Sequence, residues 1–185
     1  MDRTILINGL TFLAIDLFIF WKLSDPRSRQ EKVKSYFSLK GIFIGIYSFI
    51  FFGLNYLSGM FFPLPPSGFD DLIILVGLLV FIAGFSISIW AKLAMGKIWG
   101  VPAELRHDQN KLIKHGPFKY SRNPIYVGLI MVLIGYGLAL QSWFTFLALV
   151  PIFYYVKSTE KEEELLEKHF KEEYLKYKKE VPRFF

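Results

Sequence analysis

The sequence predicts an all-α polytopic membrane protein with about five transmembrane helices and a cytoplasmic, amphipathic C-terminal helix. Three observations support this. Hydrophobic residues make up 53% of the 185 residues, and the mean hydropathy of +0.36 is high for a soluble domain. These residues form long runs, and a helix of roughly 20 apolar residues crosses about 30 Å of hydrocarbon. The net charge is +6, but Lys and Arg lie mainly between the runs, so we expect an anionic membrane surface rather than nucleic acid as the partner.

The first half of the chain contains three of the predicted spans. The first covers residues 4–23, and no basic segment or small-residue cleavage site marks it as a signal peptide. It contains Asp16, which either faces the interior of a helix bundle or reaches water near a helix end. Residues 39–62 and 72–95 form the second and third spans. A proline-rich turn separates them and ends at Asp70, a residue suited to capping the next helix.

The second half begins with the longest polar connection, residues 96–123. Pro124 suits the first turn of a fourth span that runs to residue 140. Gln141 and Ser142 predict a tight reversal, and residues 143–156 return as a short fifth span that continues into the tail helix. The first and third connections and the tail are basic, whereas the second connection has no Lys or Arg. The positive-inside rule therefore places those basic segments in the cytoplasm and the N-terminus outside.

The tail, residues 159–179, is predicted to be one helix. Its apolar and aromatic residues fall on a single stripe at helical spacing: Leu166, Phe170, Tyr174 and Tyr177. Glu162 extends this stripe toward the membrane, and Glu163 lies slightly off it. Such a carboxylate either faces protein or ligand, or belongs to a solvated acidic first turn that complements the helix dipole.

Several other kinds of chemistry are excluded or disfavoured by the pattern. The chain has no Cys, and no two of its three His residues have the i,i+3 or i,i+4 spacing of metal ligands. It contains no GxGxxG, GxxxxGK[ST] or GxSxG motif. Its spans lack the recurring polar residues of a channel and the repeated halves of a transporter. Polar residues concentrate instead at one end of the spans, which favours an enzyme or a binding site at the cytoplasmic surface.

Two blocks of sequence resemble the isoprenylcysteine carboxyl methyltransferase family and its phospholipid methyltransferase relatives. The first block contains Gly116-Pro117-Phe118 and Arg122-Asn123-Pro124-Ile125-Tyr126-Val127-Gly128. The second contains Glu162-Glu163-Glu164-Leu165-Leu166, Phe170-Lys171-Glu172-Glu173-Tyr174-Leu175-Lys176-Tyr177 and Val181-Pro182-Arg183-Phe184-Phe185. The resemblance runs from about Trp99 onward. It implies a single integral membrane domain, residues 1–185, with three N-terminal membrane helices in 1–95 and a cofactor-binding, methyltransferase-like half in 96–185.

The family uses S-adenosylmethionine, and the resemblance implies which residues would hold this cofactor. Arg122 and Glu162 are the implied catalytic residues: Glu162 would hold the positively charged end of the cofactor, and Arg122 would either fix the turn or bind an anion. Glu163 is the second choice for the role of Glu162. The implied cofactor-binding residues are Asn110, Lys111, Leu112, Ile113, Phe118, Asn123, Pro124, Ile125, Tyr126, Glu162 and Glu163.

The chain departs from the family at three positions. Asn110 and Asn123 stand where the family often has His. Relatives that methylate prenylcysteine carboxylates carry an Arg four residues before the Glu, where this chain has Ser158 beside Lys157. Lys does not reproduce the bidentate geometry of Arg. Lys157 and Ser158 are therefore the candidate substrate-binding residues, and the acceptor is either a prenylcysteine-like carboxylate or a lipid amine or thiol.

The resemblance implies methyl transfer to a lipophilic acceptor delivered from the membrane. The expected partners are a membrane lipid or a lipid-modified small molecule, with no nucleic acid and no metal. Two alternatives remain open from the sequence. One is an NADPH-dependent membrane reductase of the sterol-reductase type, and the other is a non-catalytic membrane protein that keeps the fold.

Overall fold

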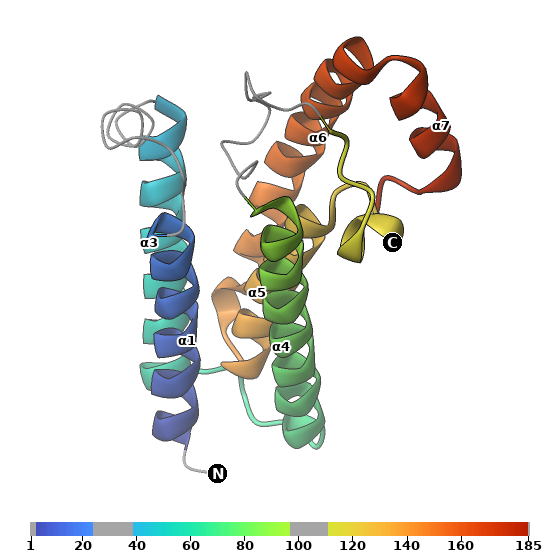
Figure 1. Cartoon of the computed structure of the whole chain (residues 1–185). Coiled ribbons are helices and arrows are strands. Elements are labelled where there is room, and N and C mark those ends of the chain that lie inside the picture. The colour runs from blue at the N-terminus through green and yellow to red at the C-terminus, as the bar shows by residue number, and fades with distance from the viewer. Residues whose placement is uncertain (1–2, 24–38, 97–110, 185) are drawn as a thin grey trace. The chain divides into compact units, whose positions relative to one another are not determined.

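The computed structural model describes residues 3–23, 39–96 and 111–184 (Figure 1). Within these ranges every regular element is a helix, which confirms the all-α prediction. The elements in chain order are α1 (Arg3–Leu23), α3 (Leu39–Phe61), α4 (Asp70–Met95), the 3-10 helix η2 (Gly116–Lys119), α5 (Pro124–Ala139), the 3-10 helix η3 (Trp143–Ala148), α6 (Leu149–Phe170) and α7 (Glu172–Glu180).

Helix length tests the predicted number of membrane crossings. Among the described residues, two segments are long and apolar enough to cross a membrane, Ile42–Phe61 and Asp70–Met95. Only 22% of the most apolar window of each is buried, whereas the core helix of a soluble protein would be mostly enclosed. Thr4–Leu17 and Pro124–Ala139 are apolar but shorter. The structure therefore supports membrane insertion, and the prediction of about five crossings is not confirmed.

The chain divides into two compact units. The first comprises residues 1–82 and 131–148, and the second comprises residues 83–130 and 149–185. In the first unit, α1 and α3 lie side by side (Figure 1). Tyr136 of α5 is fully buried there among aromatic rings, and its hydroxyl forms a hydrogen bond of 2.8 Å with Thr11 of α1. Asp16 is partly buried in α1.

The reversal after α5 forms as predicted. Gln141 has a φ of 50°, its N–H donates to the carbonyl of Leu138 at 2.9 Å, and the N–H of Ser142 donates to Gly137 at 3.0 Å. The side chain of Gln141 also donates to the carboxylate of Asp70 at 2.8 Å. The chain then continues through η3 before α6 begins, so the fifth predicted span is not a uniform α-helix from residue 143.

In the second unit, glycine brings α4 and α5 close together. A β carbon at Gly128 of α5 would collide with Ser88 Oγ and would lie 2.8 Å from the carbonyl oxygen of Gly84. Glycine at this position therefore serves close helix contact. This contact places the N-terminal end of α5 beside α4 within the unit.

The prediction of one tail helix over residues 159–179 is wrong. α6 ends at Phe170, Lys171 has a φ of 48°, and α7 starts at Glu172. The physical reason is burial. The bend at Lys171 lets the residues of the predicted stripe face one another. Tyr174, Tyr177 and Val181 then form a core, against which Leu112, Leu166 and Phe170 pack. A straight helix would have spread the same side chains along one face.

Candidate functional site

The turn that leads into α5 starts at Gly116, where the chain packs closely against α4. Gly116 has a φ of 62°, a conformation that favours glycine, and an added β carbon would lie 3.1 Å from Ala94 and 3.3 Å from Trp90. Pro117 follows as the second residue of η2, consistent with the preference of proline for a first helical turn. Phe118 is buried in a hydrophobic cluster against α4. These contacts hold the start of the turn against the C-terminal end of α4, and so position the polar residues that follow.

The C-terminal segment, residues 181–183, holds this turn by hydrogen bonds. The N–H of Arg122 donates to the carbonyl of Pro182 at 2.9 Å. Ser121 Oγ donates to the carbonyl of Arg183 at 3.1 Å and accepts from the N–H of Asn123 at 3.1 Å. Asn123 Nδ2 donates to the same carbonyl of Arg183 at 3.2 Å. Two segments about sixty residues apart in sequence therefore form one polar structure.

Glu163 of α6 lies at the centre of this structure and is only 3% exposed. Arg183 donates to both of its carboxylate oxygens, from Nε to Oε1 at 3.1 Å and from Nη2 to Oε2 at 3.0 Å. Arg122 Nη2 lies 3.3 Å from Oε1, and Asn123 Nδ2 donates to Oε1 at 3.4 Å. The hydrogen bonds to Glu163 raise the pKa of Arg183 above its ordinary value. A buried carboxylate with this many donors is well satisfied.

One nitrogen pair in this cluster has no partner. The side chain of Arg122 is 8% exposed, and its Nε and Nη1 donate to no acceptor among the described residues. A buried N–H without an acceptor costs about 1–3 kcal/mol. Arg183 pairs both with Glu163 and with the more exposed Glu160 at 3.8 Å, so the two unpartnered nitrogens of Arg122 are the part of the cluster that is open to a further acceptor.

Glu162 precedes Glu163 on α6 and has a different partner. Tyr126, in the first turn of α5, is 5% exposed, and its hydroxyl donates to Glu162 Oε2 at 3.0 Å. The ring of Tyr126 stacks on Tyr155 of α6, with centroids 5.0 Å apart and an interplanar angle of 29°. The hydrogen bond and the stacked ring together fix the position of the Tyr126 hydroxyl.

α7 supports the turn from the other side. Tyr177 donates from its hydroxyl to the carbonyl of Phe118 at 2.7 Å. Burial raises the pKa of Tyr177 to about 12 and raises the pKa of Tyr174 as well. α7 thus stabilises η2 and the turn that follows it.

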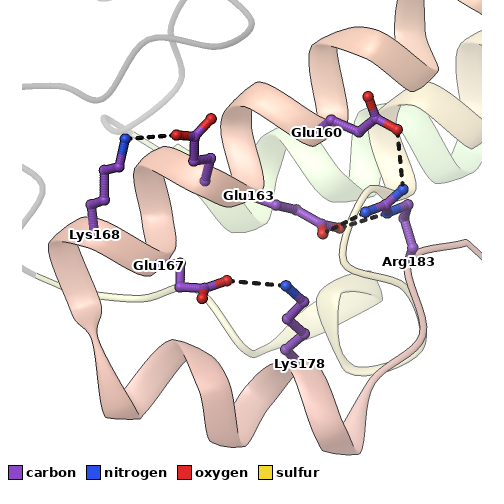
Figure 2. A pocket seen from close by; sticks show the side chains of 7 residues that line it. Glu160, Glu163, Glu167, Lys168, Lys178 and Arg183 are labelled. Atoms are coloured by element: carbon purple, nitrogen blue, oxygen red, sulfur yellow. Dashed lines mark hydrogen bonds and ion pairs between the residues drawn. The ribbon is translucent and has the colours of Figure 1, made fainter.

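A charged groove of about 310 Å³ lies between α6, α7 and the C-terminal segment. Figure 2 shows Arg183 pointing toward Glu160 and Glu163, and Lys178 pointing toward Glu167. Lys178 Nζ lies 3.0 Å from Glu167 Oε2, and the neighbouring Lys168 lies 2.6 Å from Glu164. Every residue that lines the groove is charged: Glu160, Glu163, Glu164, Glu167, Lys168, Lys178 and Arg183. Sites for a nucleoside are lined mainly by apolar side chains, so we do not assign this groove to a cofactor.

A comparison with known protein families places this geometry in context. A model of the phospholipid methyltransferase family matches residues 72–173, more than half of the chain. The matched range includes the turn at Asn123, as well as Glu162 and Glu163 on α6. The chain belongs to the phospholipid methyltransferase family.

This family is part of the isoprenylcysteine and phospholipid methyltransferase superfamily, so the resemblance seen in the sequence is confirmed. The family consists of membrane methyltransferases, which agrees with the apolar helices α3 and α4. No curated protein and no solved structure matches the chain.

Part of the family-implied site comes together around α6. Arg122 and Asn123 contact Glu163, and Tyr126 contacts Glu162. The remaining implied residues are placed differently. Pro124 is buried at the start of α5, Ile113 packs with Phe118 and Ile125 in a hydrophobic cluster, Leu112 packs against α7, Lys111 and Lys157 are exposed, and Ser158 is buried on α6. Asn110 lies outside the described residues.

Sequence reasoning missed three members of this arrangement. Arg183 was visible only as part of the closing Val181-Pro182-Arg183 block, and its Pro182 signalled only the end of a helix. Ser121 carries the ordinary signal of a turn residue before a helix start. Tyr155 sits among other aromatic residues of an apolar run, where nothing in the sequence distinguishes a stacking partner from a lipid-facing ring.

Proposed function

We propose that this member of the phospholipid methyltransferase family transfers a methyl group from S-adenosylmethionine to a lipophilic acceptor delivered from the membrane. The observation that carries the proposal is the contact between the turn that leads into α5 and the acidic part of α6. Tyr126 donates to Glu162, and Arg122 and Asn123 contact Glu163, all within the matched residues. Methyltransferases of this family generally use S-adenosylmethionine.

The residues present fit the amino-acid end of that cofactor, which carries an ammonium and a carboxylate. Arg122 has two buried donor nitrogens, Nε and Nη1, without a partner among the described residues, and these suit a carboxylate. Glu162 is partly buried and offers a carboxylate to an ammonium. Glu163 is less suited to that role, because Arg122, Asn123 and Arg183 already occupy its oxygens. The fit therefore favours Glu162 over Glu163.

S-adenosylmethionine supplies an activated methyl group on a sulfonium centre. The chain's own contribution is to bind, orient and exclude water. Glu162 binds the positive end of the cofactor, and the hydroxyl of Tyr126 holds that carboxylate in one orientation. Arg122 binds the negative end. The segment around Lys111, Leu112 and Ile113 binds the adenosine. Asn110, the other residue of this group, lies outside the described residues.

The residues one turn before Glu162 bear on the choice of acceptor. Ser158 is buried on α6, one turn before Glu162, at the position where relatives that methylate prenylcysteine carboxylates carry Arg. Lys157 is exposed. A carboxylate acceptor would lack a bidentate partner there, so a lipid amine is the better candidate, and a prenylcysteine carboxylate is the alternative. Incubating the protein with deuterated S-adenosylmethionine and each acceptor in vesicles, followed by mass spectrometry, separates the two.

Binding of S-adenosylhomocysteine to the purified full-length protein tests the cofactor assignment. We expect Glu162→Gln to weaken binding at least tenfold in calorimetry, because the ammonium loses its counter-charge. Glu164→Gln is the matched control: Glu164 lies two residues further along α6 and is exposed, with Lys168 as its partner. Wild-type affinity in Glu162→Gln would remove Glu162 from the site. If the wild type does not bind S-adenosylhomocysteine, the proposed function is refuted. Binding of NADPH would then support the membrane reductase, and binding of neither ligand would support the non-catalytic membrane protein.

The side of the membrane is also a proposal, supported by the basic connections and tail. We propose that the site faces the cytoplasm, with the N-terminus outside. The chain has no Cys, so one introduced cysteine reports one position. In the variant Lys168→Cys, the introduced cysteine at this exposed position should react with a membrane-impermeant maleimide only after the cells are opened. Labelling in intact cells would show that α6 faces the outside and would contradict the proposed topology.

A further inference from the structure

We propose that Arg183 is a positioning residue for the methyltransferase site, acting on Asn123 and through it on the start of α5. The inference rests on the proposed function and extends it to a residue in the C-terminal segment. Arg183 uses two separate groups. Its guanidinium binds Glu163 of α6, and its carbonyl binds the turn before α5.

The contacts of Arg183 form a closed ring of hydrogen bonds. The guanidinium donates to Glu163 at 3.1 and 3.0 Å, and Glu163 accepts from Asn123 Nδ2 at 3.4 Å. Asn123 Nδ2 also donates to the carbonyl of Arg183 at 3.2 Å, which closes the ring. The two N–H groups of the Asn123 amide are thereby matched to two acceptors, so one orientation of this amide is selected.

A fixed Asn123 fixes the start of α5, because this residue directly precedes Pro124. Tyr126 lies in the same first turn, and its hydroxyl donates to Glu162, which directly precedes Glu163 on α6. Arg183 therefore joins the two chain segments that bear Tyr126 and Glu162. The contacts through which it acts are those to Glu163 and to the turn before α5, so its effect on a bound cofactor is indirect.

The fold can tolerate loss of the Arg183 side chain. Glu163 would keep Arg122 at 3.3 Å and Asn123 at 3.4 Å, so its buried charge stays compensated. The Pro182 carbonyl would still accept from the N–H of Arg122, and the Arg183 carbonyl is unaffected by a side-chain change. A substitution at Arg183 thus tests orientation more than folding.

The experiment compares two ligands on the full-length protein in nanodiscs, S-adenosylhomocysteine and 5′-methylthioadenosine. The second ligand lacks the ammonium and carboxylate that Glu162 and Arg122 are proposed to bind. We expect Arg183→Gln to weaken S-adenosylhomocysteine binding at least tenfold and 5′-methylthioadenosine binding less than twofold. Lys178→Gln is the matched control, because Lys178 lies in the same groove and contacts Glu167 instead. It should leave both affinities within twofold of wild type.

An equal loss for both ligands would indicate a general structural defect and overturn the inference, as would unchanged binding of S-adenosylhomocysteine. If Arg183→Gln does not fold, Arg183→Lys is measured in the same way, and the same two outcomes decide. Lys keeps the charge but offers Glu163 a single point of contact, so we expect a selective loss of smaller size. A wild-type protein that binds neither ligand would instead refute the proposed function.

Discussion

Tyr126 donates a hydrogen bond of 3.0 Å to Glu162, joining the first turn of α5 to the acidic part of α6. The two residues are 36 positions apart in sequence and come from the two blocks that carry the family resemblance. Because Tyr126 also stacks on Tyr155, the hydroxyl has little freedom to leave Glu162. The carboxylate proposed to bind the cofactor is therefore held in advance of binding, which lowers the entropic cost of association.

Removing this hydroxyl should weaken cofactor binding without unfolding the protein. Tyr126→Phe keeps the stacked ring and deletes one hydrogen bond, which is worth about 1 kcal/mol and corresponds to roughly a fivefold loss of affinity. Calorimetry with S-adenosylhomocysteine measures it. Tyr120→Phe is the control, because Tyr120 is exposed on the polar turn. A full-strength complex with Tyr126→Phe would show that the hydrogen bond has no role in binding.

Loss of the Glu163 charge should destabilise the protein strongly. Glu163→Gln leaves the guanidiniums of Arg122 and Arg183 without a carboxylate in a buried cluster, and breaking such a pair costs about 3–5 kcal/mol. Differential scanning fluorimetry in detergent should show a clearly lower melting temperature. Glu160→Gln is the comparison, because Glu160 is exposed and lies 3.8 Å from Arg183. Its effect should stay within about 0.5 kcal/mol, and equal melting of the two variants would contradict the proposed role of Glu163.

Close contact between α4 and α5 predicts a steric effect at Gly128. Gly128→Ala would press a methyl group into Ser88 and the backbone of Gly84, and overpacking of this kind costs about 1–3 kcal/mol. Thermal melting should reveal the loss. Gly45→Ala tests the argument, because a β carbon at Gly45 meets nothing within 4 Å. There we expect no loss, or a gain of up to about 1 kcal/mol from helix propensity.

The pKa of Tyr177 predicts a loss of stability at alkaline pH. Burial raises this pKa from 10.0 to about 12, so the unfolded chain ionises first as the pH rises. The contribution is present in full below pH 10 and is lost between about pH 10 and 12, at roughly 1–3 kcal/mol. Melting temperatures of Tyr177→Phe should fall less steeply over this range than those of wild type. Tyr120→Phe should keep the wild-type slope, and identical slopes in all three proteins would disprove the assignment.

The candidate site was predictable from sequence to the extent that its residues sit in recognisable blocks. Arg122, Asn123, Tyr126, Glu162 and Glu163 were all singled out, and the structure brings them together around α6. The relative roles of the two glutamates were open, because the two residues are adjacent in the sequence. Burial separates them: Glu163 is buried and bound by three donor side chains, whereas Glu162 is only partly buried and accepts from Tyr126.

The sequence by itself determined the helical class, the apolar helices, the reversal at Gln141 and the family, because these depend on local composition and on short motifs. The tertiary structure alone decided where the tail bends and what the C-terminal segment contacts. Lys171 adopts a positive φ because the reversal buries Tyr174 and Tyr177, a gain that no local pattern records. Arg183 reaches Glu163 for the same reason: contacts between residues distant in sequence form only when the whole unit has folded.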